Sequence, residues 1–410
     1  MFKKIIFVAG IGKLHFVDSA IQFNRVDDVE TLLYSSWVPS DFSMWVLRTV
    51  GLNGLTARLQ DRVAARQNHI KVRSFLLPEL LYHAALKRIM PHDLALALAF
   101  KLFGFFSAFR VLIDSDKDTL IHLRSGAGFL FIRLARYRGA TILVDHSIAH
   151  PLEFGRLVSY IPDRYRMGAG LEGNSTLWRQ VLSDCTAADS IVVNSDFVKE
   201  TFLVQGVPAA KVSVVYLGCD LPSELGIRPP HSETLTLAFS GHFDIRKGAN
   251  VLMELMRQVS HLYQDVRLDV YGSISQSGES VIADFACSEV INFVGYLPRD
   301  EMLARLRSSD IYIFPSYMEG CAKSVVEAMA LGLPVITSKA SGAPISHGKD
   351  GLIIDDVNDI SAWIKAIDLL RCPAYRKTLG TTAQKNVTLK CTPDSYVKNL
   401  VVLYNKMFQR

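Results

Sequence analysis

Short apolar runs of strand length alternate with longer segments of helical composition along most of the chain. The stretch 311–354 shows this pattern most clearly. An apolar run at 311–315 ends at a proline, a polar acidic loop follows, and residues 322–331 have helical composition until Gly332 and Pro334. A further apolar run then begins at Val335. The pattern predicts a βαβ unit, whose loops lie at the carboxyl ends of parallel strands, where open α/β sheets bind ligands.

The length of the chain and a proline-rich linker predict two domains. We expect further strands at 3–9, 119–123, 142–144, 189–195, 235–239, 266–272, 291–295 and 335–337. A chain of 410 residues suits two domains, and prolines at 222, 229 and 230 mark a linker. We therefore divide the chain into domains at 1–221 and 222–392 and an amphipathic helix at 393–410.

Two stretches of the first domain depart from the simple alternation. The apolar run 94–113 approaches the length of a membrane span, but Lys101, Gly104 and Arg110 interrupt it, so we interpret it as a buried helix. Residues 150–176 are rich in predicted loops and contain several arginines among aromatic residues. They are expected to form either a lid over an acceptor or a variable surface.

Two carboxylates in the 311–354 stretch are the strongest candidates for chemistry. Glu319 lies in the acidic loop, and Glu327 follows eight residues later. If one helix covers both, they point to nearly one side and lie about 12 Å apart along its axis, which suits the two ends of a nucleotide-sugar. The start of the helix is a natural seat for a diphosphate, and its free N–H groups belong to Gly320, Cys321, Ala322 and Lys323.

A basic loop follows the strand at 235–239 and precedes an amphipathic helix. It contains His242, Arg246 and Lys247. Cations at a strand end can bind a diphosphate, with charge-assisted contacts of about 1.5–3 kcal/mol each. The ordinary alternative is a helix flanked by solvated basic residues.

Candidates in the first domain also stand at strand ends. Gly10 and Gly12 follow the first strand, where glycine lets backbone approach a phosphate or simply forms a tight turn. His146 ends the strand at 142–144 and is expected to face the cleft. His122 is a weaker candidate. Asp114 and Asp116 have the spacing of a metal-binding D-x-D pair, but they follow a helix at the wrong end of the sheet, which favours an ordinary loop.

The residues EGCAKSVVEAMALGLPVI at 319–336 closely resemble the E-x7-E signature of family 4 type retaining glycosyltransferases, which have the GT-B fold. The chain keeps both glutamates and departs from the family pattern at Cys321 and Ala322. Lys247 matches the lysine of the family's G-R-x4-K-G loop, while either His242 or Arg246 takes the place of the arginine.

The resemblance implies two facing Rossmann-like, doubly wound α/β domains with an interdomain cleft, and a last helix that crosses back to the first domain. It implies metal-independent transfer of a sugar from a nucleotide-diphosphate sugar to an acceptor hydroxyl, without a further cofactor. Lys247, with Arg246 or His242, would neutralise the leaving diphosphate. Glu327 would hold the ribose and Glu319 the sugar hydroxyls, with His146 near the reacting sugar. Tyr296 and Leu297 would border the base.

Composition indicates the environment. The six cysteines include no C-x-x-C pair, which argues against a zinc site or disulfide framework and favours a cytoplasmic protein. The first residues predict a strand and not a signal peptide. The whole net charge of +5 lies in residues 1–230, which favours an anionic membrane surface as a partner over nucleic acid, with solubility as the alternative.

The acceptor is expected to be a saccharide or a lipid-linked saccharide in surface polysaccharide assembly, with the protein on the inner face of the membrane. Two other functions stay open. The chain is alternatively an inactive sugar-binding relative, as the departures at 242, 321 and 322 suggest, or a GT-B nucleotide-sugar epimerase or hydrolase.

Overall fold

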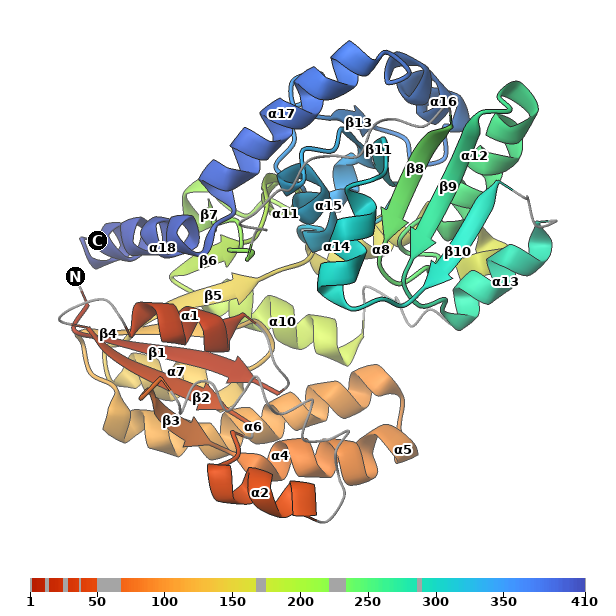
Figure 1. The fold of residues 1–410 in the computed structure, drawn as a ribbon. Coiled ribbons are helices and arrows are strands. Elements are labelled where there is room, and N and C mark those ends of the chain that lie inside the picture. Colours follow the sequence, from red (N-terminus) through yellow and green to blue (C-terminus); the bar gives the residue numbers. More distant parts are fainter. Residues whose placement is uncertain are drawn as a thin grey trace.

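The computed structural model describes residues 2–11, 15–24, 29–36, 38–49, 68–166, 175–220, 234–285 and 290–409. Within these ranges two parallel β-sheets form the centres of two α/β domains (Figure 1). The first sheet has the strand order β3-β2-β1-β4-β5-β6-β7 and the second has the order β10-β9-β8-β11-β12-β13. Each sheet starts at a central strand and grows outward on both sides, which is the doubly wound arrangement. The predicted pair of Rossmann-like domains is confirmed.

The first domain contains seven of the described strands. They are β1 (Lys4–Gly10), β2 (Glu30–Ser35), β3 (Lys71–Ser74), β4 (Thr119–Arg124), β5 (Thr141–His146), β6 (Ser190–Val193) and β7 (Val212–Val214). Its helices are α1 (Phe16–Phe23), α2 (Asp41–Thr49), α4 (Leu76–Leu81), α5 (Lys87–Ile89), α6 (His92–Asp114), α7 (Phe129–Tyr137), α8 (Pro151–Ser159), α9 (Asp163–Arg166), α10 (Thr176–Ala187) and α11 (Asp196–Val204). A π-helical turn, η1 (Tyr82–Leu86), joins α4 to α5, and the 3-10 turn η2 (Ala209–Lys211) precedes β7.

The second domain has the same architecture. Its strands are β8 (Leu235–Ser240), β9 (Val266–Tyr271), β10 (Ile291–Gly295), β11 (Ile311–Phe314), β12 (Val335–Ser338) and β13 (Leu352–Ile354). Its helices are α12 (Ala249–Leu262), α13 (Gln276–Asp284), α14 (Arg299–Leu306), α15 (Lys323–Ala330), α16 (Ile360–Leu369) and α17 (Pro373–Lys390), and η3 (Lys339–Ser341) follows β12. Helix α18 (Pro393–Phe408) ends the chain. The expected domain boundary between 221 and 222 lies outside the described residues.

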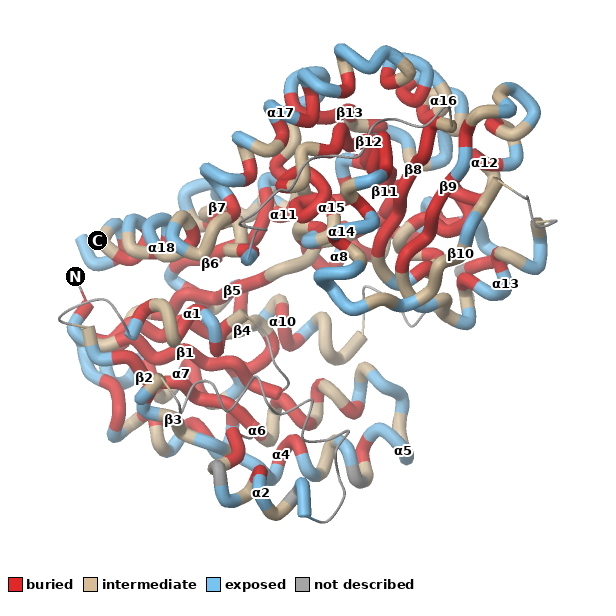
Figure 2. Tube along the Cα trace, in the orientation of Figure 1, coloured by how far each residue is buried: buried red, intermediate tan, exposed pale blue. Residues whose placement is uncertain are grey.

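The central strands are buried on both faces (Figure 2). On β1, Ile6 and Val8 belong to the hydrophobic core on one side of the sheet, and Ile5 and Phe7 belong to the core on the other side. Covering helices on both faces explain why strands of a parallel sheet are continuously apolar rather than alternating. This is why the strands could be recognised as short apolar runs.

Helix α6 is a core helix of the first domain with one uncovered side. Phe100 and Phe103 are buried in the domain core, whereas Phe109 and Ile113 are 56% and 71% exposed. By length and composition α6 is the one helix of the described residues that could cross a membrane. Its packing against the sheet and α7 agrees with the buried helix predicted from the sequence.

Segment 150–166 forms helices α8 and α9 rather than loops, so the loop-rich prediction was wrong there. Phe154 and Leu157 of α8 share a continuous hydrophobic core with the second domain. The amide Nδ2 of Asn358 also donates to the carbonyl oxygen of Tyr160, at 3.1 Å. Although α8 belongs to the first half of the sequence, it therefore packs as part of the interface between the domains.

Helix α18 returns to the first domain, beside the amino terminus (Figure 1). The hydroxyls of Tyr396 and Ser19 are 2.9 Å apart, and the ring of Phe408 lies edge-on to that of Phe2. The two domains are thus linked twice, once through the segment after β7 and once through α17 and α18.

Candidate active site

A pocket of about 570 Å³ opens at the carboxyl ends of β8, β9, β10 and β11 in the second domain. Seven of the residues predicted from the sequence line it: His242, Lys247, Glu319, Cys321, Ala322, Lys323 and Glu327. Tyr296 and Leu297, expected to border a base, line it as well, while Ser273 and Ser324 were missed because isolated serines carry no distinctive pattern. The pocket therefore brings most of the predicted donor-side residues together from separate loops.

Lys247 is held with its ammonium group close to the end of β8. A Cβ atom at Gly241 would lie 2.9 Å from the Lys247 Nζ, and Gly241 has a φ of +130°, so glycine provides both the space and the conformation. The Nζ also lies 5.9 Å from the centre of the Phe314 ring. The backbone N–H of Lys247 donates to Asp244 at 2.8 Å, which fixes the turn.

His242 and Arg246 have different positions, which separates the two candidates for the missing arginine. Nη1 of Arg246 donates to Oε1 of Glu319 at 2.8 Å and to the Met318 carbonyl at 2.9 Å. Arg246 is not among the pocket-lining residues, whereas His242 is. Arg246 supports the loop that carries Glu319, and His242 is the residue that borders the pocket beside Lys247.

The two glutamates do not lie on one helix. Helix α15 begins at Lys323, so Glu319 stays in the preceding loop and the helical spacing of about 12 Å does not apply. Glu327 is in the helix, where its Oε1 accepts from Nε of Arg299 at 2.9 Å. In the described part of the chain, an arginine donates to Oε1 of each glutamate, and Oε2 of each accepts no hydrogen bond from a described residue.

The first turn of α15 carries no side-chain cap among the described residues. The N–H of Ala322 donates to the carbonyl of Ser341, so it is already used. The following residues, Lys323 and Ser324, line the pocket at the positive end of the helix dipole. The predicted diphosphate-binding segment 320–323 is therefore reduced to Lys323, and Ser324 is added to it.

Gly320 is where the two domains touch beside the pocket. A Cβ atom there would lie 1.8 Å from the carbonyl oxygen of Ser147, which follows β5 of the first domain. The hydroxyl of Ser195, after β6, donates to the carbonyl of Gly320 at 2.5 Å. Gly320 therefore serves the contact between the domains and is not itself a lining residue of the pocket.

His146 does not point into the cleft, contrary to the sequence-based expectation. Its ring is 2% exposed, and Nε2 lies 3.3 Å from the carbonyl of Ala149, which can only accept, so Nε2 carries the proton. Nδ1 then accepts from the hydroxyl of Ser125 at 2.9 Å. Burial lowers the pKa of His146 to about 4. The neutral ring braces the turn that carries Ser147.

A buried polar cluster at the same strand ends combines the candidate His122 with residues that were not among the predicted site residues, including Asp145 and His15. Oδ2 of Asp145 accepts from Nε2 of His15 at 2.7 Å and from Nε2 of His122 at 3.2 Å. Nδ1 of His122 accepts from the hydroxyl of Tyr404 on α18, at 2.7 Å. Although burial alone would raise it, the pKa of Asp145 is lowered by both histidines. The weak candidate His122 therefore has a place in linking α18 to the first sheet.

Of the predicted glycines after β1, Gly12 lies outside the described residues. Gly10 has a φ of +70°, and a Cβ atom there would lie 2.7 Å from the ring of Phe100 on α6. Its close approach is therefore to a core aromatic residue.

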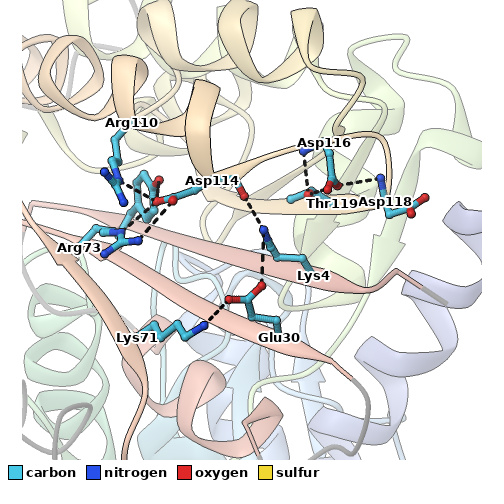
Figure 3. Close-up of polar contacts among 10 residues, drawn as sticks. Lys4, Glu30, Lys71, Arg73, Arg110, Asp114, Asp116, Asp118 and Thr119 are labelled. Atoms are coloured by element: carbon cyan, nitrogen blue, oxygen red, sulfur yellow. Dashed lines mark hydrogen bonds and ion pairs between the residues drawn. The ribbon is translucent and has the colours of Figure 1, made fainter.

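Asp114 and Asp116 make their contacts within the first domain (Figure 3), although Asp114 ends α6 and only Asp116 lies in the loop expected from the sequence. Oδ2 of Asp114 accepts from Nε of Arg73 at 2.9 Å, and Arg110 and the Tyr34 hydroxyl donate to the same oxygen. Although burial opposes it, these donors hold the pKa of Asp114 below its usual value. Asp116 accepts from Thr119 at the start of β4, which lies at the amino ends of the strands of the first sheet.

Comparison with known proteins gives the chain its family. The family model described as glycosyl transferases group 1 matches residues 227–386, and the model of glycosyltransferase family 4 matches residues 55–222. The chain belongs to the family 4 glycosyltransferases. The second-domain match covers the whole pocket, and the first-domain match includes a region, up to residue 117, in which no family pattern was recognised.

Relatives with a stated role are distant. The D-inositol 3-phosphate glycosyltransferase of Corynebacterium kroppenstedtii is 28% identical over 209 residues, which is 45% of this chain and 46% of that protein. The amylovoran biosynthesis glycosyltransferase AmsK of Erwinia amylovora is 29% identical over 161 residues, 36% of this chain and 39% of its own. The alignments thus span less than half the length of these two relatives.

Solved glycosyltransferase structures share the whole fold. HepE of Anabaena, crystallised in complex with UDP and glucose, has a TM-score of 0.63 at 15% identity, over 99% of this chain and all of its own. Sucrose-phosphate synthase of Thermosynechococcus elongatus has a TM-score of 0.66 at 16% identity, over 99% of both chains. At this identity the likeness shows the GT-B fold.

Proposed function

We propose that this glycosyltransferase moves a hexose from a nucleotide-diphosphate sugar to an acceptor hydroxyl, with retention of anomeric configuration and without a metal ion. The observation that carries the proposal is the pocket in which Lys247, Glu319 and Glu327 converge from three segments of the second domain. The contact of Gly320 with Ser147, which follows β5 of the first domain, supports an acceptor that approaches from that domain.

Each side chain has a role that its contacts support. The bond between the anomeric carbon and the β-phosphate oxygen breaks, the acceptor oxygen bonds to the same face, and its proton passes to the departing diphosphate. Lys247 stabilises the charge that develops on that diphosphate. Oε2 of Glu327 accepts from the ribose hydroxyls and Oε2 of Glu319 from the sugar hydroxyls, each carboxylate being oriented by its arginine.

Metal independence is proposed because the chain supplies its own cation to the diphosphate. Lys247 and the amino-terminal end of α15 face one pocket from two sides. The carboxylate of Asp114, in contrast, is committed to Arg73 and Arg110. Transfer in the presence of excess EDTA should proceed at the rate measured without it, and loss of activity that Mg²⁺ restores would contradict this part of the proposal.

The acceptor is proposed to be a saccharide, free or carried on a lipid, in surface polysaccharide assembly at the cytoplasmic face of a membrane. Large apolar side chains exposed on the first domain support it, including Phe42, Trp45, Leu80, Phe109 and Ile113. The positive charge of the same half adds attraction to anionic lipid. Flotation with vesicles of phosphatidylcholine and phosphatidylglycerol should retain the protein, and Trp45→Ser with Phe42→Ser should weaken the retention.

The donor is identified first by binding. Nucleotide sugars are screened by thermal shift, because a ligand of the folded state raises the melting temperature. Product analysis with the donor that binds should show a glycoside of the same anomeric configuration. Lys247→Ala should reduce kcat by about 10²–10³, while Lys349→Ala, an exposed lysine outside the pocket, should not. An epimerised or hydrolysed sugar without an acceptor product, or binding without turnover, would favour the two alternatives.

A further inference from the structure

We propose that His242 is a donor-binding residue that supplies the second positive charge for the donor diphosphate only when its imidazole is protonated. The inference rests on the proposed donor site. It makes donor binding dependent on pH in a way that a guanidinium at the same place would not, because an arginine stays charged at every physiological pH.

The position of His242 fits contact with a phosphate group. His242 and Lys247 line the same pocket from the two ends of one loop. Lys247 approaches the backbone of Gly241, the residue that precedes His242, closely enough that a Cβ atom there would lie 2.9 Å from its Nζ. A diphosphate that contacts Lys247 at the end of β8 is therefore within reach of the neighbouring imidazole.

The hydrogen bonds of His242 assign its protons. Nδ1 lies 3.1 Å from the carbonyl oxygen of Ser273 and 2.6 Å from its hydroxyl. Since a carbonyl can only accept, Nδ1 is the protonated nitrogen of the neutral ring. Nε2, which has no partner within the described residues, then carries a lone pair. Facing a phosphate, that lone pair is repulsive, whereas the N–H of the imidazolium donates a charge-assisted hydrogen bond.

Arg246 cannot take over this role in the arrangement observed. Its guanidinium is 2.8 Å from Oε1 of Glu319 and also donates to the Met318 carbonyl. Moving it to the phosphate would leave Glu319 without its anchor. The guanidinium of Arg246 is thus committed to the sugar-binding glutamate. The diphosphate then faces the ammonium group of Lys247 and the imidazole of His242.

The charges around His242 couple proton and donor binding. Its own loop carries two further charged side chains, Lys247 and Asp244. Tyr271 and Tyr296 face the pocket from β9 and from the end of β10, and Glu319, Lys323 and Glu327 stand across it. A bound diphosphate adds two negative charges and favours the imidazolium, so by linkage the protein takes up a proton when the donor binds.

The test is calorimetric titration of wild-type protein with UDP-glucose and GDP-mannose at pH 6, 7 and 8. The diphosphate of a nucleotide sugar keeps two negative charges over this range, so the ligand does not titrate. We expect affinity to fall about tenfold from pH 6 to pH 8. Near neutral pH, buffers of different ionisation enthalpy should report proton uptake on binding.

Three variants locate the effect. His242→Arg should bind tightly with no pH dependence, and His242→Gln should bind weakly with no pH dependence. Lys247→Ala should bind more weakly at every pH and should still bind more tightly at pH 6 than at pH 8. Thermal melting of each free variant checks that it is folded.

The results that would overturn the role of His242 differ from those that would overturn the donor site. Wild-type affinity that does not change with pH would overturn the role of His242 and leave the donor site intact. A His242→Gln variant whose affinity depends on pH as strongly as that of the wild type would do the same. Failure of both nucleotide sugars to bind at pH 6, or binding that Lys247→Ala does not weaken, would overturn the donor site and this inference with it.

Discussion

The buried imidazole of His146 should make the first domain sensitive to mild acid. The ring is enclosed. Its Nε2–H donates a hydrogen bond to the carbonyl of Ala149, and its Nδ1 accepts one from the hydroxyl of Ser125. Protonation of Nδ1 would break the second bond and bury a charge. Replacement of His146 by glutamine removes the titration while keeping an amide that can donate to Ala149.

The magnitude follows from the two pKa values. The pKa is 6.5 for an ordinary histidine and about 4 for His146 in the fold. Above pH 6.5 both the folded and unfolded chains are neutral at this position, and the stabilisation is fully present. As the pH falls toward 4, only the unfolded chain takes up the proton, so stability is lost. Between pH 7 and pH 5 this linkage amounts to about 2 kcal/mol.

Urea denaturation at pH 7, 6 and 5 measures the effect in wild type and in His146→Gln. Hydrogen exchange of the peptide covering 141–150 shows whether the loss is local. Burial also lowers the pKa of His122 and His150, so both proteins should lose stability in acid. The wild type should lose about 2 kcal/mol more.

Two results would refute the reasoning about His146. Equal losses of stability in wild type and variant would show that the ring is not held neutral by the fold. A variant with unchanged stability at pH 7, wild-type donor affinity and a kcat reduced by a thousandfold or more would instead give His146 a chemical role.

Three other substitutions test the site and its support. Gly320→Ala would place a methyl group 1.8 Å from the Ser147 carbonyl. The rate of transfer should therefore fall more than tenfold, while the affinity for the nucleotide-sugar changes less. Equal losses of rate and affinity would contradict a role of Gly320 in the contact between the domains. Glu327→Gln should weaken donor binding about tenfold, by calorimetry, because a neutral amide accepts more weakly than a carboxylate; unchanged affinity would argue against the ribose contact. Tyr404→Phe leaves Nδ1 of the buried His122 without its donor and should lower unfolding free energy by about 1–3 kcal/mol in urea denaturation; no change would show that the bond contributes nothing.

The local elements were predictable because their causes are local. The strand β10 was predicted at its observed bounds, and α15 lies within the predicted 322–331. The α/β class and the loops that line the pocket followed from the same alternation, whereas the pair of facing Rossmann-like domains was implied by the family resemblance. Helix α8 was missed although His150 caps it and Pro151 begins it, because glycine and arginine among its apolar residues obscured the helical pattern.

What a side chain faces was decided only by the tertiary structure. From the sequence alone, His242 and Arg246 were equal candidates for the diphosphate, and the choice depends on Glu319, which is 73 residues from Arg246. His146 was placed at the right strand end but was expected to face the cleft, because one of its two partners, Ser125, is 21 residues away on another segment. Hydrophobic periodicity and turn residues act within a few positions and determine elements, whereas the direction and charge of a polar side chain depend on partners that only folding brings near.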